Sequence, residues 1–237
     1  MSTTQRQEQI LEILKERSFI TVRELSEITF TSPSSVRRDL AFLQSNGLVQ
    51  RTHGGVVAVE SVKNVASFPD RFKKNVKEKR AIAQSASRFL KDGQTVLLDS
   101  SSTVTFLLPY IAKFKRISLF TNNLITATRA IEMGIDTHCL GGRSLNGSAI
   151  LSGISTYHAL DEITVDVLFF SSQSLSDDGV ISDSTEEENY LRKLMLKGAK
   201  KKIFLCDSSK FHASSTYKLC TLNDVDEAIF DVEREQL

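Results

Sequence analysis

From residue 78 to residue 206, short apolar stretches alternate with segments of helical periodicity. Consecutive parallel strands need a crossover connection, which a helix usually supplies, so this alternation predicts a mostly parallel sheet with helices on both faces. Such strands are buried on both sides, in agreement with their nearly unbroken apolar composition. The expected strands are 95–98, 117–121, 135–140, 165–170 and 202–206, with two more between 217 and 230, and the expected helices are 78–90, 103–113, 124–133 and 186–199.

The first 57 residues follow a different pattern, in which three helical segments precede a hairpin. Thr21 and Glu24 form a T-x-x-E capping box at the start of the second segment. Ser32 is expected to cap the third segment, where Pro33 takes the first helical position without cost because that N–H has no partner in any helix. Two apolar arms then flank a basic, glycine-containing tip at 51–55, which is typical of a hairpin.

The third helical segment has the two faces that a DNA-reading helix needs. Val36, Leu40 and Leu43 recur at i, i+4 and i+7, so they face a core. The opposite side starts with small hydroxyls, which suit phosphate, and carries Arg37 and Arg38, which suit a guanine edge. The pattern favours a winged helix-turn-helix that binds DNA over a three-helix module that contacts another protein. The candidate DNA contacts are Thr21, Ser32, Ser34, Ser35, Arg37, Arg38, Arg51 and His53.

Composition and charge place a boundary between the two patterns. Residues 60–77 are polar and then basic and show little periodicity, so we expect a linker at 58–77 between a DNA-binding domain at 1–57 and a larger α/β domain at 78–237. The net charge is only +1, yet residues 63–91 hold nine lysines and arginines against two acidic residues. This basic stretch either contacts the DNA backbone or packs on an acidic neighbour, and the sequence does not decide between them.

Polar residues follow several predicted strands at their carboxyl ends, where open α/β sheets bind ligands. After strand 95–98, hydroxyls and free N–H groups gather at a helix start, a pattern that suits phosphate. Glycines after a later strand allow close approach of the backbone, and Lys210 adds a positive charge. The sequence therefore predicts a site for a small anion. The candidate contacts are Asp99, Ser100, Ser101, Ser102, Thr103, Thr121, Asn122, Gly141, Gly142, Glu188 and Lys210.

Two other functions remain open for this domain. An isomerase or transferase acting on sugar phosphates would need a carboxylate base, which Asp99 or Glu188 could supply. A dedicated DNA-binding module would be unusual on such an enzyme. The domain could also serve mainly to oligomerise the chain. The acidic run at 186–188 has a structural explanation as well, because negative charge is favourable at a helix start.

The sequence resembles the DeoR-type bacterial regulators along most of its length. In the N-terminal part the resemblance rests on the run Ser35-Val36-Arg37-Arg38-Asp39-Leu40 and on Arg51-Thr52-His53-Gly54-Gly55. Further along, it rests on 99–103, Thr121-Asn122, Gly141-Gly142, Gly153, Glu188 and 207–210. The resemblance implies that Arg37 and Arg38 contact DNA. Since phosphate repels a carboxylate, Asp39 is expected to hold an arginine or cap locally instead.

The same resemblance implies a sensor domain similar to the ribose-5-phosphate isomerase and CoA-transferase folds. It implies control by a phosphorylated sugar or a related metabolite and, more usually, repression of a carbohydrate-metabolism operon. Three departures concern the ligand. Ser101 replaces a frequent glycine in the phosphate loop, Ser171-Ser172 stand where a glycine is common, and Arg192 replaces a frequent lysine. They leave open whether the effector is a plain sugar phosphate.

The expected partners are double-stranded operator DNA, a small anionic effector and further copies of the chain, as a dimer or tetramer whose symmetry matches paired half-sites. No cofactor, metal site or catalytic residue is expected, because the four histidines are scattered and the three cysteines lack zinc spacing. The polar N-terminus lacks a signal-peptide pattern, and no apolar run reaches the about 18 residues that span a bilayer. We therefore expect a cytoplasmic protein.

Overall fold

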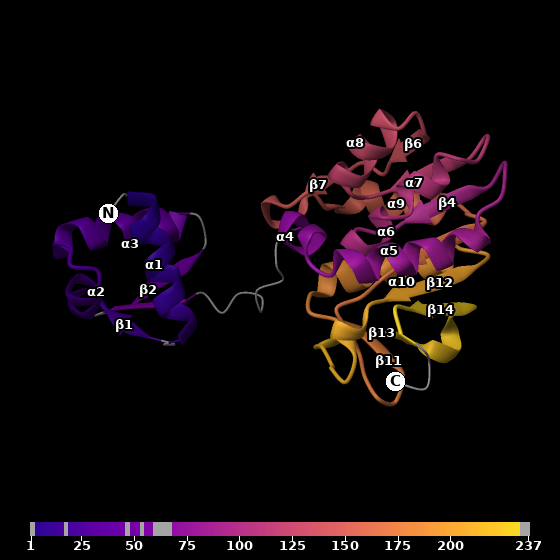
Figure 1. Ribbon diagram of the computed structural model, residues 1–237. Helices are drawn as coiled ribbons and strands as arrows, with labels where there is room; N and C mark the ends of the chain where they lie inside the picture. Colours follow the sequence, from indigo (N-terminus) through magenta and orange to yellow (C-terminus); the bar gives the residue numbers. More distant parts are fainter. Residues whose placement is uncertain (1–2, 17–18, 46–47, 53–54, 59–67, 233–237) are drawn as a thin grey trace. The chain divides into compact units, whose positions relative to one another are not determined.

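The computed structural model of the chain describes residues 3–16, 19–45, 48–52, 55–58 and 68–232. Two compact units make up the chain, an N-terminal unit (residues 1–63) and a C-terminal unit (residues 64–237) (Figure 1). In the described ranges, no helix combines the length and the apolar character that crossing a membrane requires.

The N-terminal unit is a three-helix module completed by a small antiparallel sheet. Its apolar residues at helical spacing meet in one core, which includes Ile10, Leu25, Val36, Leu40 and Leu43. The strand order is β1-β3-β2. This arrangement confirms the predicted helix-turn-helix with a wing. Its elements are α1 (Thr3–Glu16), β1 (Ile20–Thr21), α2 (Val22–Ile28), α3 (Pro33–Ser45), β2 (Val49–Thr52) and β3 (Gly55–Ala58).

Two side-chain caps fix where α2 and α3 begin. The N–H of Glu24 donates to Thr21 Oγ1 at 3.2 Å, and the N–H of Thr21 donates to the Glu24 carboxylate at 2.8 Å, which completes the predicted capping box. At α3, the N–H of Ser35 donates to Ser32 Oγ at 3.3 Å. Each cap satisfies a donor that the helix start would otherwise leave unpaired.

The C-terminal unit is built on a six-stranded parallel sheet, as the alternating pattern predicts. Its strands lie in the order β14-β12-β9-β4-β5-β6, and every neighbouring pair is parallel. Their bounds are β4 (Thr95–Leu98), β5 (Ser118–Thr121), β6 (Asp136–Cys139), β9 (Val167–Phe170), β12 (Lys202–Cys206) and β14 (Glu227–Phe230).

Helices cover both faces of this sheet. Alternate residues of a strand point to opposite faces, and they belong to two separate hydrophobic cores. Val96 and Leu98 join one cluster with residues of α5, α6, α7 and α8, whereas Leu97 joins a second cluster with residues of α9 and α10. Figure 1 shows α5 and α6 lying along the sheet. The helices are α5 (Val76–Ala86), α6 (Ser102–Thr105), α7 (Leu108–Ile111), α8 (Leu124–Glu132), α9 (Ile154–Glu162) and α10 (Glu186–Lys197).

Two small antiparallel sheets and four short 3-10 helices complete the described part of the C-terminal unit. One sheet has the order β10-β11-β13, and the other pairs β7 with β8. The strands are β7 (Arg143–Ser144), β8 (Leu151–Ser152), β10 (Ser174–Leu175), β11 (Val180–Asp183) and β13 (Tyr217–Thr221), and the 3-10 helices are η1 (Ser87–Phe89), η2 (Leu145–Gly147), η3 (Ser208–Lys210) and η4 (Leu222–Asp224).

The structure differs from the expected linker at 58–77. Residues 59–67 lie outside the described part, but α4 (Phe68–Lys73) and the first residues of α5 fall inside the expected linker. Phe68 is buried, and the Phe72 ring stacks on Phe106 at a centroid distance of 4.7 Å. These aromatic contacts hold a helix too short to show periodicity. The expected helix at 103–113 is also divided into α6 and α7, with Pro109 in the first turn of α7, where proline is tolerated.

Candidate functional site

The outer face of α3 carries the basic side chains that the sequence assigns to DNA. Arg37 and Arg38 are exposed, as is Ser34 near the start of the helix. Arg38 Nη2 lies 3.5 Å from Ser35 Oγ, so the guanidinium points back toward the helix start. These groups stand opposite the buried face of α3, where the donors of an arginine can reach base edges or phosphates.

Two other candidates at the N-terminal unit have their hydroxyls engaged. Thr21 Oγ1 donates to the Glu24 carboxylate at 2.7 Å, and Ser32 Oγ lies 2.9 Å from Ser34 Oγ. Thr21 and Ser32 thus hold the helix starts in place. Arg51 belongs to β2, but its side chain is outside the described part, and His53 lies entirely outside it.

Asp39 on α3 is buried and accepts a hydrogen bond from Arg6 Nε of α1 at 2.5 Å and one from Gln7 Nε2 at 3.3 Å. The expectation that Asp39 holds an arginine is therefore confirmed. The pairing neutralises the carboxylate and ties α1 to α3, so that the positive charge of Arg37 and Arg38 is not offset by a neighbouring acid on the same helix face.

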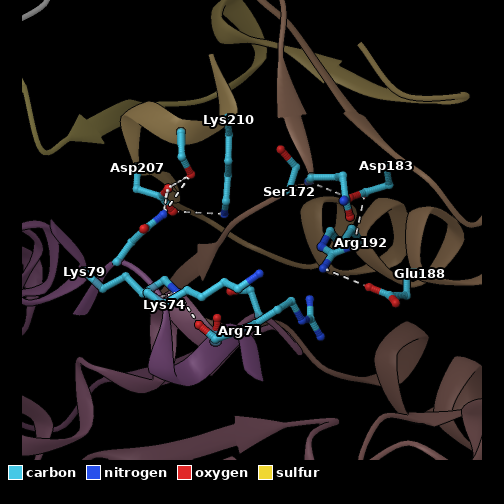
Figure 2. Close-up of a pocket in the computed structure, with 14 residues that line it drawn as sticks. Arg71, Lys74, Lys79, Ser172, Asp183, Glu188, Arg192, Asp207 and Lys210 are labelled. Carbon is cyan, nitrogen blue, oxygen red and sulfur yellow. Dashed lines mark hydrogen bonds and ion pairs between the residues drawn. The ribbon is translucent and has the colours of Figure 1, made fainter. Parts of the chain in front are cut away.

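A polar cavity of about 300 Å³ lies in the C-terminal unit (Figure 2). It opens beyond the carboxyl ends of β4, β9 and β12, three adjacent strands of the sheet. Helix α4 and the start of α5 complete its wall. The lining residues are Arg71, Lys74, Asn75, Lys79, Ser101, Ser102, Ser172, Gln173, Asp183, Glu188, Arg192, Asp207, Ser209 and Lys210.

The loop after β4 is folded around a buried carboxylate. Asp99 accepts a hydrogen bond from the N–H of Ser101 at 3.0 Å and one from the N–H of Ser171 at 3.4 Å. Asp99 therefore shapes the loop instead of lining the cavity. The hydroxyl of Ser101 lines the cavity and is buried without a partner among the described residues, as is that of Thr103 nearby. Ser101 thus offers an unused hydrogen-bonding group to a bound molecule.

Arg192 anchors one side of the cavity by contacting three carboxylates. Its nitrogens lie 2.8 Å from Asp99, 3.1 Å from Asp183 and 3.3 Å from Glu188. Burial alone would lower the pKa of Arg192, but these three carboxylates outweigh it and raise the pKa. Burial raises the pKa of Asp183. Three carboxylates around one guanidinium leave this side of the cavity acidic.

The opposite side is formed by residues that follow β12. Lys210 Nζ donates to Ser171 Oγ at 2.8 Å and lies 3.6 Å from Asp207. Burial opposes ionisation of Asp207, but Lys210 and hydrogen bonds from Ser209 and Asn75 lower its pKa. Figure 2 shows the Asp207 and Lys210 pair well separated from the Arg192 cluster.

Helices α4 and α5 add positive charge between these two sides. Arg71, Lys74 and Lys79 all reach the cavity from this segment (Figure 2). Within the described part of the chain, none of the three forms an ion pair with a carboxylate, and Arg71 Nε is buried without a hydrogen-bond partner. Burial lowers the pKa of Arg71 and lowers the pKa of Lys79 to about 8. The sequence did not indicate that these three cations line the cavity, because they fall in or beside the expected linker.

Of the predicted ligand contacts, the structure brings Ser101, Ser102, Glu188 and Lys210 together at the cavity, with Asp99, Ser100 and Thr103 buried in the adjoining loop. Four others lie elsewhere. Asn122 Nδ2 donates to the carbonyl of Leu151 at 3.1 Å, and Thr121 Oγ1 accepts from the N–H of Asn123. Gly141 and Gly142 belong to the loop after β6, at the far end of the sheet.

Gly142 has a structural reason to be glycine. Its φ is +124°, and a Cβ there would lie 2.2 Å from Thr156 Oγ1 and 2.7 Å from the carbonyl oxygen of Ser152. The Thr156 hydroxyl in turn donates to the carbonyl of Gly141 at 2.5 Å. This loop is thus packed against α9 and β8, and its glycines serve that packing.

A winged helix with outward arginines, joined in one chain to an α/β unit with a charged cavity, defines a class of ligand-sensing DNA-binding regulators. The family model described as DeoR-like helix-turn-helix domain matches residues 6–62, and the one described as DeoR C terminal sensor domain matches residues 74–232. The chain belongs to the DeoR family of transcription regulators, and this assignment excludes the enzyme alternative.

Curated relatives match over nearly the full chain. The HTH-type transcriptional regulator GolR of Listeria innocua serovar 6a is 32% identical over 228 residues, which cover 96% of this chain and 90% of GolR. The HTH-type transcriptional repressor GlcR of Bacillus subtilis is 30% identical, over 94% of this chain and 86% of GlcR. Among solved structures, eIF2B delta of Chaetomium thermophilum aligns with a TM-score of 0.51 at 15% identity, over 68% of this chain and 58% of that one. That last likeness concerns the fold alone.

Proposed function

We propose that this regulator represses a carbohydrate-metabolism operon and that a phosphorylated sugar in the polar cavity controls its affinity for operator DNA. The observation that carries the proposal is the division of the cavity into two kinds of groups. Arg71 and Lys74, which pair with no carboxylate among the described residues, would bind a phosphate together with the serine hydroxyls, and the carboxylates would bind sugar hydroxyls. The family assignment and the named repressor GlcR among its relatives support the repressor role.

The cationic groups suit the phosphoryl end of the ligand. Arg71 presents a guanidinium whose planar donors match phosphate oxygens, and Lys74 adds a mobile point charge. The hydroxyls of Ser101 and Ser102, beside the start of α6, offer further hydrogen bonds, and that of Ser101 has no hydrogen-bond partner in the described part of the chain. Ser101 therefore replaces the family's frequent glycine with an additional hydrogen-bonding group.

The carboxylates suit the polyol end. Glu188 is only partly buried and lines the cavity beside Asp183, and ionised carboxylates accept hydrogen bonds from sugar hydroxyls. The cavity volume of about 300 Å³ is at the lower end of the range for small-molecule sites, which favours a small, single-ring or open-chain ligand.

Helix α3 is the proposed DNA-binding element, with Arg38 as the candidate base contact and Arg37 as the candidate phosphate contact. A single helix of this length covers one half-site only, so we propose that the chain acts as a dimer or tetramer that places two winged helices on paired half-sites. The C-terminal unit is the proposed source of this oligomer.

A thermal-shift assay on the full chain tests the proposal. The panel contains ribose 5-phosphate, fructose 6-phosphate and glucose 6-phosphate, with each unphosphorylated sugar and inorganic phosphate as controls. A ligand that binds only the folded state stabilises it by about 2.7 kcal/mol at 100 times its Kd, so at least one sugar phosphate should raise Tm by several degrees. The same compound should change the gel-shift affinity for operator DNA.

Two variants sharpen this assay. Arg71→Ala should remove the Tm shift, whereas Lys77→Ala, on the same segment but outside the cavity lining, should keep it. Ser102→Glu should abolish the effect of the ligand and leave the binding of DNA by the free protein intact. The new carboxylate would occupy the proposed phosphate position and repel the phosphate of the ligand. If no sugar phosphate shifts the Tm of the wild-type chain, the proposed effector class is wrong.

A further inference from the structure

Helix α4 contributes to the wall of the polar cavity and is also the element at which the C-terminal unit begins along the chain. It is the first described element of the C-terminal unit and follows residues 59–67, which connect it covalently to β3. Arg71 of α4 and Lys74, which follows it, line the cavity. A change in the position of α4 would therefore alter the contacts with a ligand and would also move the point at which the segment to the DNA-binding unit is attached.

A single buried lysine fastens the end of α4. Lys79 is 4% exposed, and its ammonium donates to the carbonyl of Arg71 at 2.5 Å and to that of Lys74 at 2.8 Å. The Arg71 carbonyl lies in the last turn of α4, where it also accepts from the N–H of Lys74 at 3.3 Å, and the Lys74 carbonyl directly follows the helix. Helix geometry leaves such terminal carbonyls with free acceptor capacity. Lys79 thus uses its buried charge to close the end of a helix that has only six residues.

Asn75 fastens the junction of α4 and α5 to the sheet. Its backbone has a φ of +51°, a left-handed conformation that asparagine tolerates better than most residues. Its side-chain Nδ2 donates to Asp207 Oδ1 and to Ser209 Oγ, both at 2.9 Å. The junction is thereby tied to the carboxyl end of β12, on the wall of the same cavity.

The other side of α4 rests on aromatic contacts. Phe72 stacks on Phe106, directly after α6, and the Arg129 guanidinium lies 4.0 Å from the centre of the Phe72 ring. Helix α6 begins at Ser102, which lines the cavity. The stacked rings of Phe72 and Phe106 thus connect α4 with α6, and both helices contribute residues to the cavity lining. Polar contacts hold α4 on one side, and aromatic stacking holds it on the other.

We propose that Lys79 is a positioning residue that sets α4 at the cavity, so that Arg71 and Lys74 meet the bound anion, and that the placement of α4 sets the DNA affinity of the chain. The proposal rests on the proposed function for the identity of the anion. The role of Lys79 is independent of that function, because its contacts with the carbonyls of Arg71 and Lys74 define it.

The test uses the full chain as wild type, Lys79→Met, Lys79→Arg and the control Lys77→Met, which alters an exposed lysine at the start of the same helix. Methionine has nearly the length of lysine but cannot donate to the two carbonyls. Hydrogen–deuterium exchange should become about tenfold faster in residues 68–74 of Lys79→Met, with the sheet unchanged, because the local opening energy falls. Lys79→Arg should restore much of the protection, and Lys77→Met should match the wild type.

Binding to operator DNA, selected from a random pool with the wild-type chain, supplies the functional readout. Without ligand, Lys79→Met should differ from the wild type by about fivefold or more in Kd, within the range of allosteric coupling, and Lys77→Met should not differ. Unchanged exchange in residues 68–74, or faster exchange with a Kd within about twofold of the wild type, would overturn the proposal. If Lys79→Met fails to fold, Asn75→Gly, which keeps the left-handed backbone and removes two hydrogen bonds, must show both effects more weakly.

A ligand arm separates this proposal from the proposed function. Ribose 5-phosphate, fructose 6-phosphate and glucose 6-phosphate are added in turn, with inorganic phosphate as the control. The sugar phosphate that raises the Tm of the wild type should slow exchange in residues 68–74 of the wild type and act less on Lys79→Met. If none of the three alters exchange or Tm in the wild type, the effector class is wrong, while the comparison without ligand still decides the role of Lys79.

Discussion

The two units of this regulator neutralise their buried acids in different ways. In the N-terminal unit, Asp39 is matched by one arginine, Arg6, which pairs with no second carboxylate among the described residues. In the C-terminal unit, Arg192 is shared among Asp99, Asp183 and Glu188. The first arrangement leaves a helix face that is purely basic. The second leaves an acidic surplus beside Arg71, Lys74 and Lys79, which form no ion pair with a carboxylate in the ranges that the structure describes.

This difference matches what each surface has to bind. DNA presents phosphates and base edges to the helix that binds it. A basic helix face is sufficient for that contact when the charge of the one aspartate on the helix is neutralised by a buried ion pair. A phosphorylated polyol has an anionic end and a hydroxyl end, so a cavity with separated acidic and basic groups is needed. The comparison also predicts different costs, because breaking a pair that contains one carboxylate should cost less than removing the shared partner of three.

The largest effect is expected for Arg192→Met. The substitution keeps much of the side-chain volume but leaves three buried or partly buried carboxylates without their cation, which should lower the free energy of unfolding by about 3–5 kcal/mol. Chemical denaturation at neutral pH measures it. Arg88→Met is the matched control, since its ion pair with Glu227 is 3.8 Å long and exposed and should be worth less than about 1 kcal/mol. Equal losses for the two variants would contradict the assigned role of Arg192.

Asp39→Ala should cost less, about 1–3 kcal/mol, because it leaves only Arg6 and Gln7 without their acceptor and Arg6 remains close to solvent. Hydrogen exchange in α1 and α3 of the full chain should locate the loss. The control is Glu27→Ala, which removes an exposed pair with Arg23 in the same unit and should cost no more than about 0.5 kcal/mol. A loss as small as that of the control would mean that the Asp39 pair does not stabilise the unit.

The same contrast explains which parts could be predicted from the sequence. The buried face of α3 and the caps at Thr21 and Ser32 depend on residues within one or two helical turns, so periodicity and capping rules suffice. The pairing of Asp39 with Arg6 joins positions 33 residues apart, and the sequence could only indicate that a partner exists.

The cavity was harder to predict because strand order decides which strand ends meet. Polar residues follow β4, β5, β6 and β12 alike, but the order β14-β12-β9-β4-β5-β6 places β4 beside β9 and β12 and carries β6 away from them. Ser101 and Lys210 consequently meet at the cavity, whereas Gly141 does not. Arg71 had no local signal, since α4 has six residues and is held by aromatic contacts distant in sequence.

Arg38→Ala tests whether the basic face of α3 reads DNA. Losing a pair of hydrogen bonds to a guanine should weaken operator binding by about 1–3 kcal/mol and relax the preference at that base. Fluorescence anisotropy with operator DNA and with single-base variants measures both effects. Arg88→Ala, in the C-terminal unit, is the control for loss of one positive charge. Unchanged affinity and unchanged preference in Arg38→Ala would remove this residue from the interface.

The smallest predicted effect concerns the pH dependence of stability at Lys79. Burial lowers the pKa of Lys79 to about 8 in the folded chain, from 10.5, with Asp207 and Glu78 raising it and Lys210 and Arg71 lowering it. Between these two pKa values the unfolded chain binds more protons, so a rise in pH favours the folded state. The charge of Lys79 therefore costs stability below pH 8, and this cost declines as the pH rises from 8 toward 10.5.

The free energy of unfolding of the wild type should thus gain about 1 kcal/mol or more relative to Lys79→Met between pH 7.5 and pH 9.5. Denaturation curves at both pH values measure the difference, and all other titrating groups cancel to the extent that the two chains share them. Lys77→Met should follow the wild type, because Lys77 is exposed. Parallel pH profiles for wild type and Lys79→Met would show that the ammonium is solvated, and the closure of α4 by a buried charge would then lose its basis.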